Sequence, residues 1–148
     1  MPNIKERFVN ELERAAIVTF LNQVVEFEAE EIEEFFEITQ PVHFEKGEMI
    51  FQSNDLRGDC FFLLSGLVRS YYLFDDKEVN TRLFAAPAFV LQLSNYVNQS
   101  PSGEHVQTVT ACDGLLLKRQ DFLAGEIRES RKQMILRRTA ELHYVMME

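Results

Sequence analysis

Tryptophan is absent from this chain of 148 residues, and cysteine, glycine and proline are scarce. The two cysteines, Cys60 and Cys112, fall in or beside apolar runs. They are too few for an iron–sulfur cluster, which normally needs four thiolates, and we expect both to be reduced and buried. A chain of this length buries a core without disulfides, which favours a single domain over residues 1–148.

Long apolar runs are also missing from the sequence. No run approaches the roughly 20 residues that a membrane-spanning helix needs. The N-terminal segment is charged throughout and lacks the apolar stretch of a signal peptide. We therefore expect a cytoplasmic protein that makes no membrane contact.

Basic residues are outnumbered, with 15 Lys and Arg against 24 Asp and Glu and a net charge of -9. Residues 1–48 alone hold twelve Glu against four Lys or Arg. Because phosphate binding needs clustered Lys and Arg, this chain is not expected to bind nucleic acid by itself. The acidic segment at 27–38 is interpreted as a solvated helix face, and a protein-binding surface is the alternative.

Histidine is too sparse for a typical metalloenzyme. His43, His105 and His143 are spread along the chain and none is paired with another. Metal-dependent oxygenases and isomerases need two or three histidines and a carboxylate that converge on the metal. No Ser/His/Asp or Cys/His arrangement is present either. We therefore expect no catalytic residue and no metal ligand.

Three zones follow from the periodicity. Residues 1–40 predict helices, on two apolar stripes at Ile4, Phe8, Leu12 and Ala15 and at Ala29, Ile32 and Phe36. Residues 41–118 predict strands at 49–52, 60–65, 67–74, 78–84, 105–111 and 114–118, separated by turn residues. Short strands without intervening helices predict an antiparallel barrel, sandwich or jelly roll, in which 67–74 and 78–84 form a hairpin.

Residues 119–148 predict a long closing helix. Its apolar positions repeat at four, three and four residues, the spacing of a coiled-coil seam. The seam residues are Ile135, Thr139, Leu142 and Met146. We therefore expect this helix to pair two copies of the chain in a homodimer.

One stretch of the strand zone, from Phe44 to Phe84, carries a family resemblance. It contains Lys46-Gly47-Glu48 before the first strand, the turn DLRGD at 55–59, and the run FLLSGLVR at 62–69. The sequence resembles the cyclic-nucleotide-binding β-roll of the Crp/Fnr regulators. Gly47, Gly58 and Gly66 stand where a roll turns sharply, and such turns often need a positive φ.

The resemblance implies a mainly β fold, a double-stranded β-helix of jelly-roll type, with N-terminal helices and a long C-terminal dimerisation helix. It also implies a small-molecule effector inside the roll and against that helix. In the family a helix-turn-helix domain beyond the helix contacts DNA, and we expect no such domain within this chain. We expect DNA binding to need a further C-terminal domain outside this chain.

In the phosphate-binding cassette this sequence departs from the pattern of the family. The family has Gly-Glu, then Arg and a small hydroxyl residue, and here Leu91-Gln92 and Ser102-Gly103 take these places. No Lys or Arg occurs between Arg82 and Lys118, so a buried phosphate has no cationic partner from this loop. The degenerate cassette is predicted to comprise Leu91, Gln92, Leu93, Ser102, Gly103 and Glu104.

Several questions stay open from the sequence. A standard cyclic nucleotide is disfavoured, which leaves a neutral or weakly polar effector, or a degenerate roll that serves only as an interaction module. A haem sensor is a further alternative, with axial ligands drawn from His43, His105, Cys60 and Cys112. Arg69 and Arg82 are expected to pair on the surface or across strands, with an inward orientation as the alternative.

Overall fold

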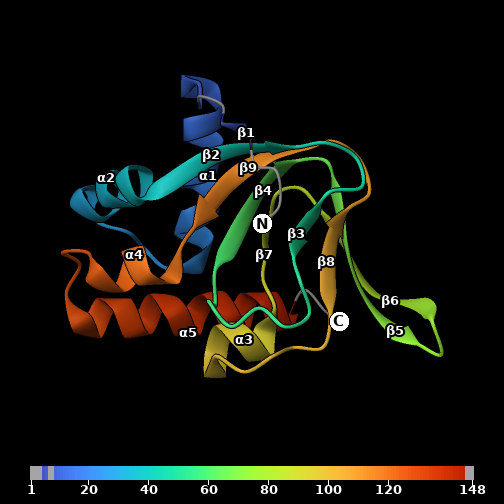
Figure 1. Cartoon of the computed structure of the whole chain (residues 1–148). Coiled ribbons are helices and arrows are strands. Elements are labelled where there is room, and N and C mark those ends of the chain that lie inside the picture. The colour runs from blue at the N-terminus through green and yellow to red at the C-terminus, as the bar shows by residue number, and fades with distance from the viewer. Residues whose placement is uncertain (1–4, 7–8, 146–148) are drawn as a thin grey trace.

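A computed structural model describes residues 5–6 and 9–145, with side chains placed for residues 9–92 and 95–143. Two antiparallel sheets form a roll, and the helices gather on one side of it (Figure 1). The helices are α1 (Glu11–Val24), α2 (Ala29–Ile38), α3 (Leu93–Asn98), α4 (Arg119–Ala124) and α5 (Glu129–Val145).

The larger sheet has the strand order β1-β2-β9-β4-β7 and the smaller one β3-β8-β5-β6. The strands of the larger sheet are β1 (Lys5–Glu6), β2 (Thr39–Phe44), β9 (Cys112–Leu117), β4 (Cys60–Ser65) and β7 (Ala88–Val90). Those of the smaller sheet are β3 (Met49–Phe51), β8 (His105–Thr108), β5 (Leu67–Phe74) and β6 (Lys77–Ala85). This is the β-roll that the resemblance implies.

Strand β4 shows how the sequence builds two hydrophobic cores on one sheet. Successive side chains of a strand point to opposite faces, so Phe61 and Leu63 enter the interior of the roll while Cys60 and Phe62 face outward. The inner core also contains Phe44, Val68, Phe84 and Val106, and the outer core contains Ile17, Leu21, Phe35, Phe89 and Leu115. The outer face of the larger sheet therefore needs a cover.

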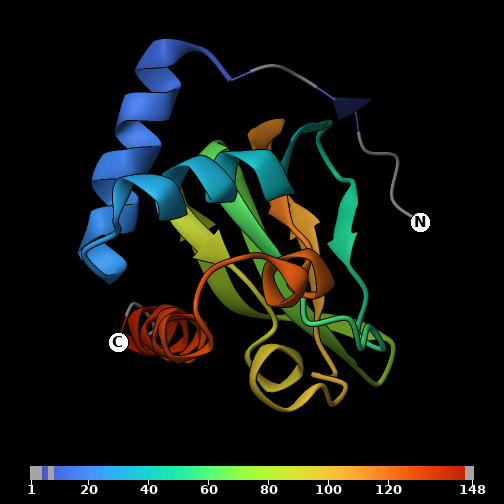
Figure 2. The ribbon, with the colours of Figure 1, turned by 90° about the vertical axis from the view of Figure 1, so that its left-hand side faces the viewer.

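Helices α1, α2, α4 and α5 provide that cover (Figure 2). The predicted N-terminal stripe is wrong in phase, since Leu12 is 83% exposed and Ile4 and Phe8 lie outside the described residues. Helix α1 begins only at Glu11, where Asn10 and Glu13 form a capping box. Its buried positions are Ile17, Phe20, Leu21 and Val24.

Helix α2 also turns a different side inward. Glu31 and Phe35 are its buried residues, whereas Ala29 is exposed and Ile32 and Phe36 are half-buried. The sequence pattern missed this orientation because it assigns a glutamate to solvent. Here a half-buried partner on α5, Arg131, compensates the charge of Glu31.

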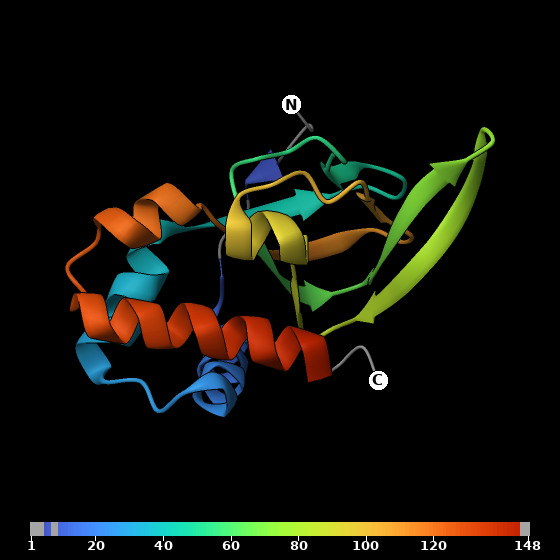
Figure 3. The same cartoon turned by 90° about the horizontal axis from the view of Figure 1, so that it is seen from below.

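The predicted hairpin is confirmed, since β5 and β6 pair from Leu67–Ala85 to Phe74–Lys77. Asp75 and Asp76 alone form its loop, with φ values of 50° and 63° that suit a two-residue hairpin turn. Gly47, Gly58 and Gly66 also have positive φ, of 81°, 71° and 104°. The hairpin projects away from the helices (Figure 3).

Two zone boundaries differ from the sequence prediction. Strand β2 already begins at Thr39, and Pro41 lies within it opposite Leu115. The closing helix is divided into α4 and α5, because the chain leaves the helix at Gly125. Buried Lys132 donates to the carbonyls of Leu123 and Gly125 and so holds the end of α4 against α5.

Candidate functional site

The degenerate cassette, residues 91–104, runs from the end of β7 through α3 to β8. Its central residue is Gln92, which is only 6% exposed. The Nε2 of Gln92 lies 2.8 Å from the carbonyl oxygen of Gln52, 2.8 Å from that of Glu104 and 3.1 Å from Ser102 Oγ. One amide group therefore ties both ends of the cassette to the loop after β3.

Two further backbone donors of the cassette loop are bonded to the protein itself. Ser102 Oγ accepts the backbone N–H of Glu104 at 3.0 Å, and the Gly103 N–H donates to the carbonyl of Ser53 at 3.3 Å. Backbone N–H groups bind a phosphate only when they point at it. In this loop the donors of Gly103 and Glu104 are engaged with the protein itself.

The structure brings four of the six predicted cassette residues together, namely Gln92, Ser102, Gly103 and Glu104. Leu91 does not join them, because its buried side chain packs in the outer core against the helices. The side chain of Leu93 lies outside the described residues. The predicted loop is thus a closed polar cluster rather than a lined cavity.

The sequence prediction missed a second cluster, in which Arg82 of β6 meets His143 of α5. The Arg82 guanidinium hydrogen-bonds the imidazole of His143, and that ring stacks on Phe84 with 5.7 Å between ring centroids. Burial, and then the charge of Arg82, lower the pKa of His143 from 6.5 to about 4. Arg82 Nη2 is itself buried and has no partner among the described residues.

Arg82 therefore points inward, which the sequence analysis left open as the alternative, whereas Arg69 does not. Arg69 pairs across strands, as expected, with Gln107 at 2.6 Å and Glu78 at 2.8 Å. Burial lowers the pKa of Arg82, while the carboxylate of Glu104 raises it. Arg82 thus lies between the cassette and α5, although it is 61 residues away from His143 in sequence.

Helix α5 is fastened to the N-terminal helices by polar contacts. Arg131 forms two hydrogen bonds with the Glu31 carboxylate, at 2.6 and 2.9 Å. This bonding lowers the pKa of Glu31 although burial opposes it. Arg138 donates to the carbonyl of Val24 at 3.1 Å, which adds a contact with α1.

The predicted dimerisation seam needs correction. Ile135 and Thr139 are 7% and 5% exposed and face the interior of their own chain, so a second helix cannot reach them in this arrangement. Leu142 is half-buried against the outer core, and Met146 lies outside the described residues. The periodicity marks an apolar side of α5 correctly, but this side packs on the chain's own sheet.

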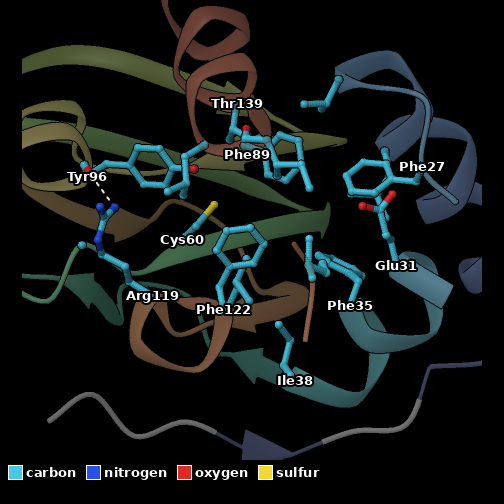
Figure 4. A pocket seen from close by; sticks show the side chains of 17 residues that line it. Phe27, Glu31, Phe35, Ile38, Cys60, Phe89, Tyr96, Arg119, Phe122 and Thr139 are labelled. Carbon is cyan, nitrogen blue, oxygen red and sulfur yellow. Dashed lines mark hydrogen bonds between the residues drawn. The ribbon is translucent and has the colours of Figure 1, made fainter. Parts of the chain in front are cut away.

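A pocket lies between the outer face of the larger sheet and the helices; we call it the helix pocket (Figure 4). Cys60, Phe89 and Leu117 form its floor, and side chains from all five helices close it. The cavity measures about 40 Å³ and is lined almost wholly by apolar groups. Burial raises the pKa of the Cys60 thiol at its floor, so this cysteine is protonated.

The two remaining histidines considered as metal or haem ligands are bonded within the protein. His43 on β2 bonds Asp113 at 2.7 Å, and His105 on β8 accepts the backbone N–H of Ser53. Both cysteines are free and buried. Over residues 5–6 and 9–145, no group of three or more His, Cys, Asp or Glu is placed to hold a metal ion, and no helix is long and apolar enough to cross a membrane.

Comparison with known proteins adds a family and one curated relative. Residues 41–125 match the family described as the cyclic nucleotide-binding domain. The nitrogen fixation regulation protein FixK of Bradyrhizobium diazoefficiens is 30% identical over 115 residues. That alignment covers 78% of this chain and 46% of FixK, so the chain spans about half the length of this relative.

Solved structures share the fold at lower identity. A cyclic nucleotide-binding domain from Methylobacillus flagellatus has a TM-score of 0.80 at 14% identity, over 97% of this chain and 83% of that one. The catabolite activator protein of Thermus thermophilus has a TM-score of 0.64 at 20% identity, over 81% and 55%. The regulatory domain of Toxoplasma gondii PKA, in co-crystal with cAMP, has a TM-score of 0.71 at 18% identity, over 85% and 48%.

Proposed function

This chain belongs to the cyclic nucleotide-binding domain family, and on that basis we propose that it is the effector-sensing domain of a transcription regulator related to FixK. The relationship to FixK supports the regulatory role. The contact between the roll and α5 supports the sensing role, because an effector shifts an equilibrium only if it favours one helix arrangement. Arg82 and His143 form such a contact beside the cassette.

We also propose that the effector is not a standard cyclic nucleotide. The observation that carries this is the position of Gln92, whose amide bridges Gln52, Ser102 and Glu104 across the cassette. A cyclic nucleotide has to break these bonds and bury its phosphate beside Glu104 without an arginine from the loop, and Arg82 of β6 is already bonded to His143. Burying an unpaired charge costs several kcal/mol.

Thermal melting with and without millimolar cAMP or cGMP tests this part of the proposal. A ligand present at 100 times its Kd adds about 2.7 kcal/mol to the free energy of unfolding, which raises the melting temperature by several degrees. We expect no shift with either nucleotide. A cAMP-binding domain of the same fold serves as the positive control, and a clear shift for this chain contradicts the proposal.

Homodimerisation stays part of the proposal, but through a different surface from the predicted seam. Tyr72 and Phe74, two residues apart on β5 and therefore on one face of the β5–β6 hairpin, are 38% and 65% exposed. Exposed apolar side chains that lie together mark interaction sites, and this hairpin projects from the body of the domain (Figure 3). A second copy of the chain is the partner proposed for it.

A further inference from the structure

The helix pocket contains polar groups at opposite ends, with Arg119 at one and Glu31 at the other (Figure 4). Glu31 is satisfied by its two hydrogen bonds from Arg131. Arg119, at the start of α4, is only partly satisfied. Its Nη1 donates to the carbonyl of Tyr96 at 2.7 Å, but its Nε is buried and has no acceptor within the described part of the chain.

No carboxylate among the described residues is paired with the Arg119 guanidinium. The nearby Asp59 accepts the backbone N–H of Arg119 at 3.0 Å, and its other oxygen lies 3.7 Å from Arg57. A guanidinium offers donors in a fixed planar fork that matches a carboxylate. Arg119 is therefore a half-buried cation at the edge of an apolar cavity, with donor capacity left over.

A second unsatisfied group, Asn95 of α3, lies at the same end. Asn95 is 1% exposed, and neither Oδ1 nor Nδ2 of its side chain has a hydrogen-bond partner among the described residues. A Cβ added to Gly58 would lie 2.9 Å from Arg119 Cδ and 3.5 Å from Asn95 Oδ1, so both side chains approach this glycine. Buried polar groups without partners are rare in folded proteins and need an explanation.

We propose that the helix pocket binds a small carboxylic acid with an apolar body, with the carboxylate at Arg119 and the body between Phe122 and Phe89. The apolar lining suits the body of such a ligand, and Arg119 Nε supplies the donor for its carboxylate. The Asn95 amide lies beside Gly58 of the pocket wall but does not itself line the cavity. This site lies on the outer face of the sheet and does not depend on the argument about the cassette.

Because the cavity is small, ligand binding should be coupled to a movement of the helices that line it. About 40 Å³ holds roughly three water-sized groups, so an acid of four to seven carbons has to displace part of the lining. The floor is a paired sheet, whereas α4 and α5 are fastened mainly by side-chain contacts such as those of Arg131 and Lys132. Binding therefore moves α4 and α5 outward relative to the sheet.

The test is a titration of the full chain with sodium butanoate, hexanoate and benzoate, followed by amide NMR and thermal melting. At least one acid should saturate below about 10 mM, a weak but specific range, and should shift the signals of Tyr96, Leu117 and Phe122. The matched neutral amide of that acid should bind at least about tenfold more weakly, because charge-assisted hydrogen bonds are the stronger ones.

Variants separate this site from unspecific binding. Arg119→Gln should weaken the acid about tenfold or more, while Arg137→Gln, an exposed arginine of α5, should leave its affinity unchanged. Thr139→Leu, which fills the cavity from α5, should abolish binding. This second variant keeps the test valid if Arg119→Gln does not fold. The proposal is overturned if no acid saturates, if Arg119→Gln binds as well as the wild type, or if the shifted signals cluster at Gln92 and Ser102.

Discussion

Two buried side chains, Gln92 and His143, distinguish this roll from one shaped around a cyclic phosphate. Gln92 occupies the cassette with its own amide, and His143 takes the hydrogen bond of the inward arginine, Arg82. A sequence pattern shows that the loop has no arginine, but not what fills the space instead. Residue types alone therefore predict that the cassette arginine is missing, but they do not predict the contact between Arg82 and α5.

His143 provides a pH-dependent prediction. Its pKa falls from 6.5 to about 4 on folding, so between these values the unfolded chain binds the extra proton. The stabilisation by neutral His143 is thus fully present above about pH 6.5 and is lost as the pH falls toward 4. The loss amounts to about 3 kcal/mol, at 1.36 kcal/mol for each pKa unit.

Urea unfolding at several pH values checks this prediction against a His143→Gln variant. The variant should be less stable than the wild type at pH 7, because it loses the stacking on Phe84. The difference in the free energy of unfolding should shrink as the pH falls from 6.5 to 4.5, since only the wild type suffers the proton penalty. A difference that stays constant over this range argues against a buried neutral histidine.

Among the secondary-structure elements, the strands were predicted best. The runs at 60–65 and 67–74 match β4 and β5 because turn residues bound them on both sides. Strand β2 was missed since its first residues continue an acidic helical pattern and it contains Pro41. Strand β7, which has three residues, was also missed.

The orientation of α5 could not be read from its periodicity. A repeat of apolar residues shows that one side of a helix is covered, but it does not tell whether the cover is the same chain or a partner. Here Ile135 and Thr139 face the chain's own sheet. Contacts between residues about 100 positions apart, such as that of Glu31 with Arg131, decide the outcome.

The Glu31–Arg131 pair predicts how firmly α5 is attached. Arg131→Met leaves a buried carboxylate on α2 without a partner, and we expect the free energy of unfolding to fall by about 2 kcal/mol. Arg137→Met, which removes an exposed pair with Glu141 on the same helix, should cost less than about 0.5 kcal/mol. Urea unfolding at pH 7 measures both variants.

The stabilisation by the Glu31–Arg131 pair also depends on pH, which gives a second test of the pair. Hydrogen bonding to Arg131 lowers the pKa of Glu31, so the contribution of the pair is present above the ordinary glutamate pKa of about 4.3 and is lost below it. Glu31→Gln combined with Arg131→Met should recover part of the stability lost in Arg131→Met. Equal losses for Arg131→Met and Arg137→Met would show that α5 does not depend on this pair.

At the scale of the whole domain, the helices lie on one side and the hairpin projects on the other, which suggests that ligand binding and self-association use separate surfaces. The helices cover the sheet and line the helix pocket (Figure 2). The hairpin presents Tyr72 and Phe74 to solvent on one face. The sequence predicted the division into helices and a roll, whereas the exposure of the hairpin tip could be seen only in the structure.

The proposed homodimer is tested through that hairpin. Phe74→Ser should weaken self-association, because it removes an apolar side chain that a second copy buries. Leu12→Ser, which changes the 83% exposed leucine of α1, is the matched control and should have no effect. Light scattering over a range of concentrations gives the mass of each variant, and equal masses for Phe74→Ser and the wild type exclude this surface.

We propose that Gln92 closes the cassette to cyclic nucleotides, and its side-chain amide reports on this directly. We would record the NMR signals of that amide, assigned with a Gln92→Leu variant, with and without millimolar cAMP. A closed cassette predicts signals that are protected from exchange with water and unmoved by the nucleotide, because the amide is buried and bonded to Gln52 and Glu104. A rapidly exchanging amide, or one whose signals shift saturably with cAMP, would contradict it.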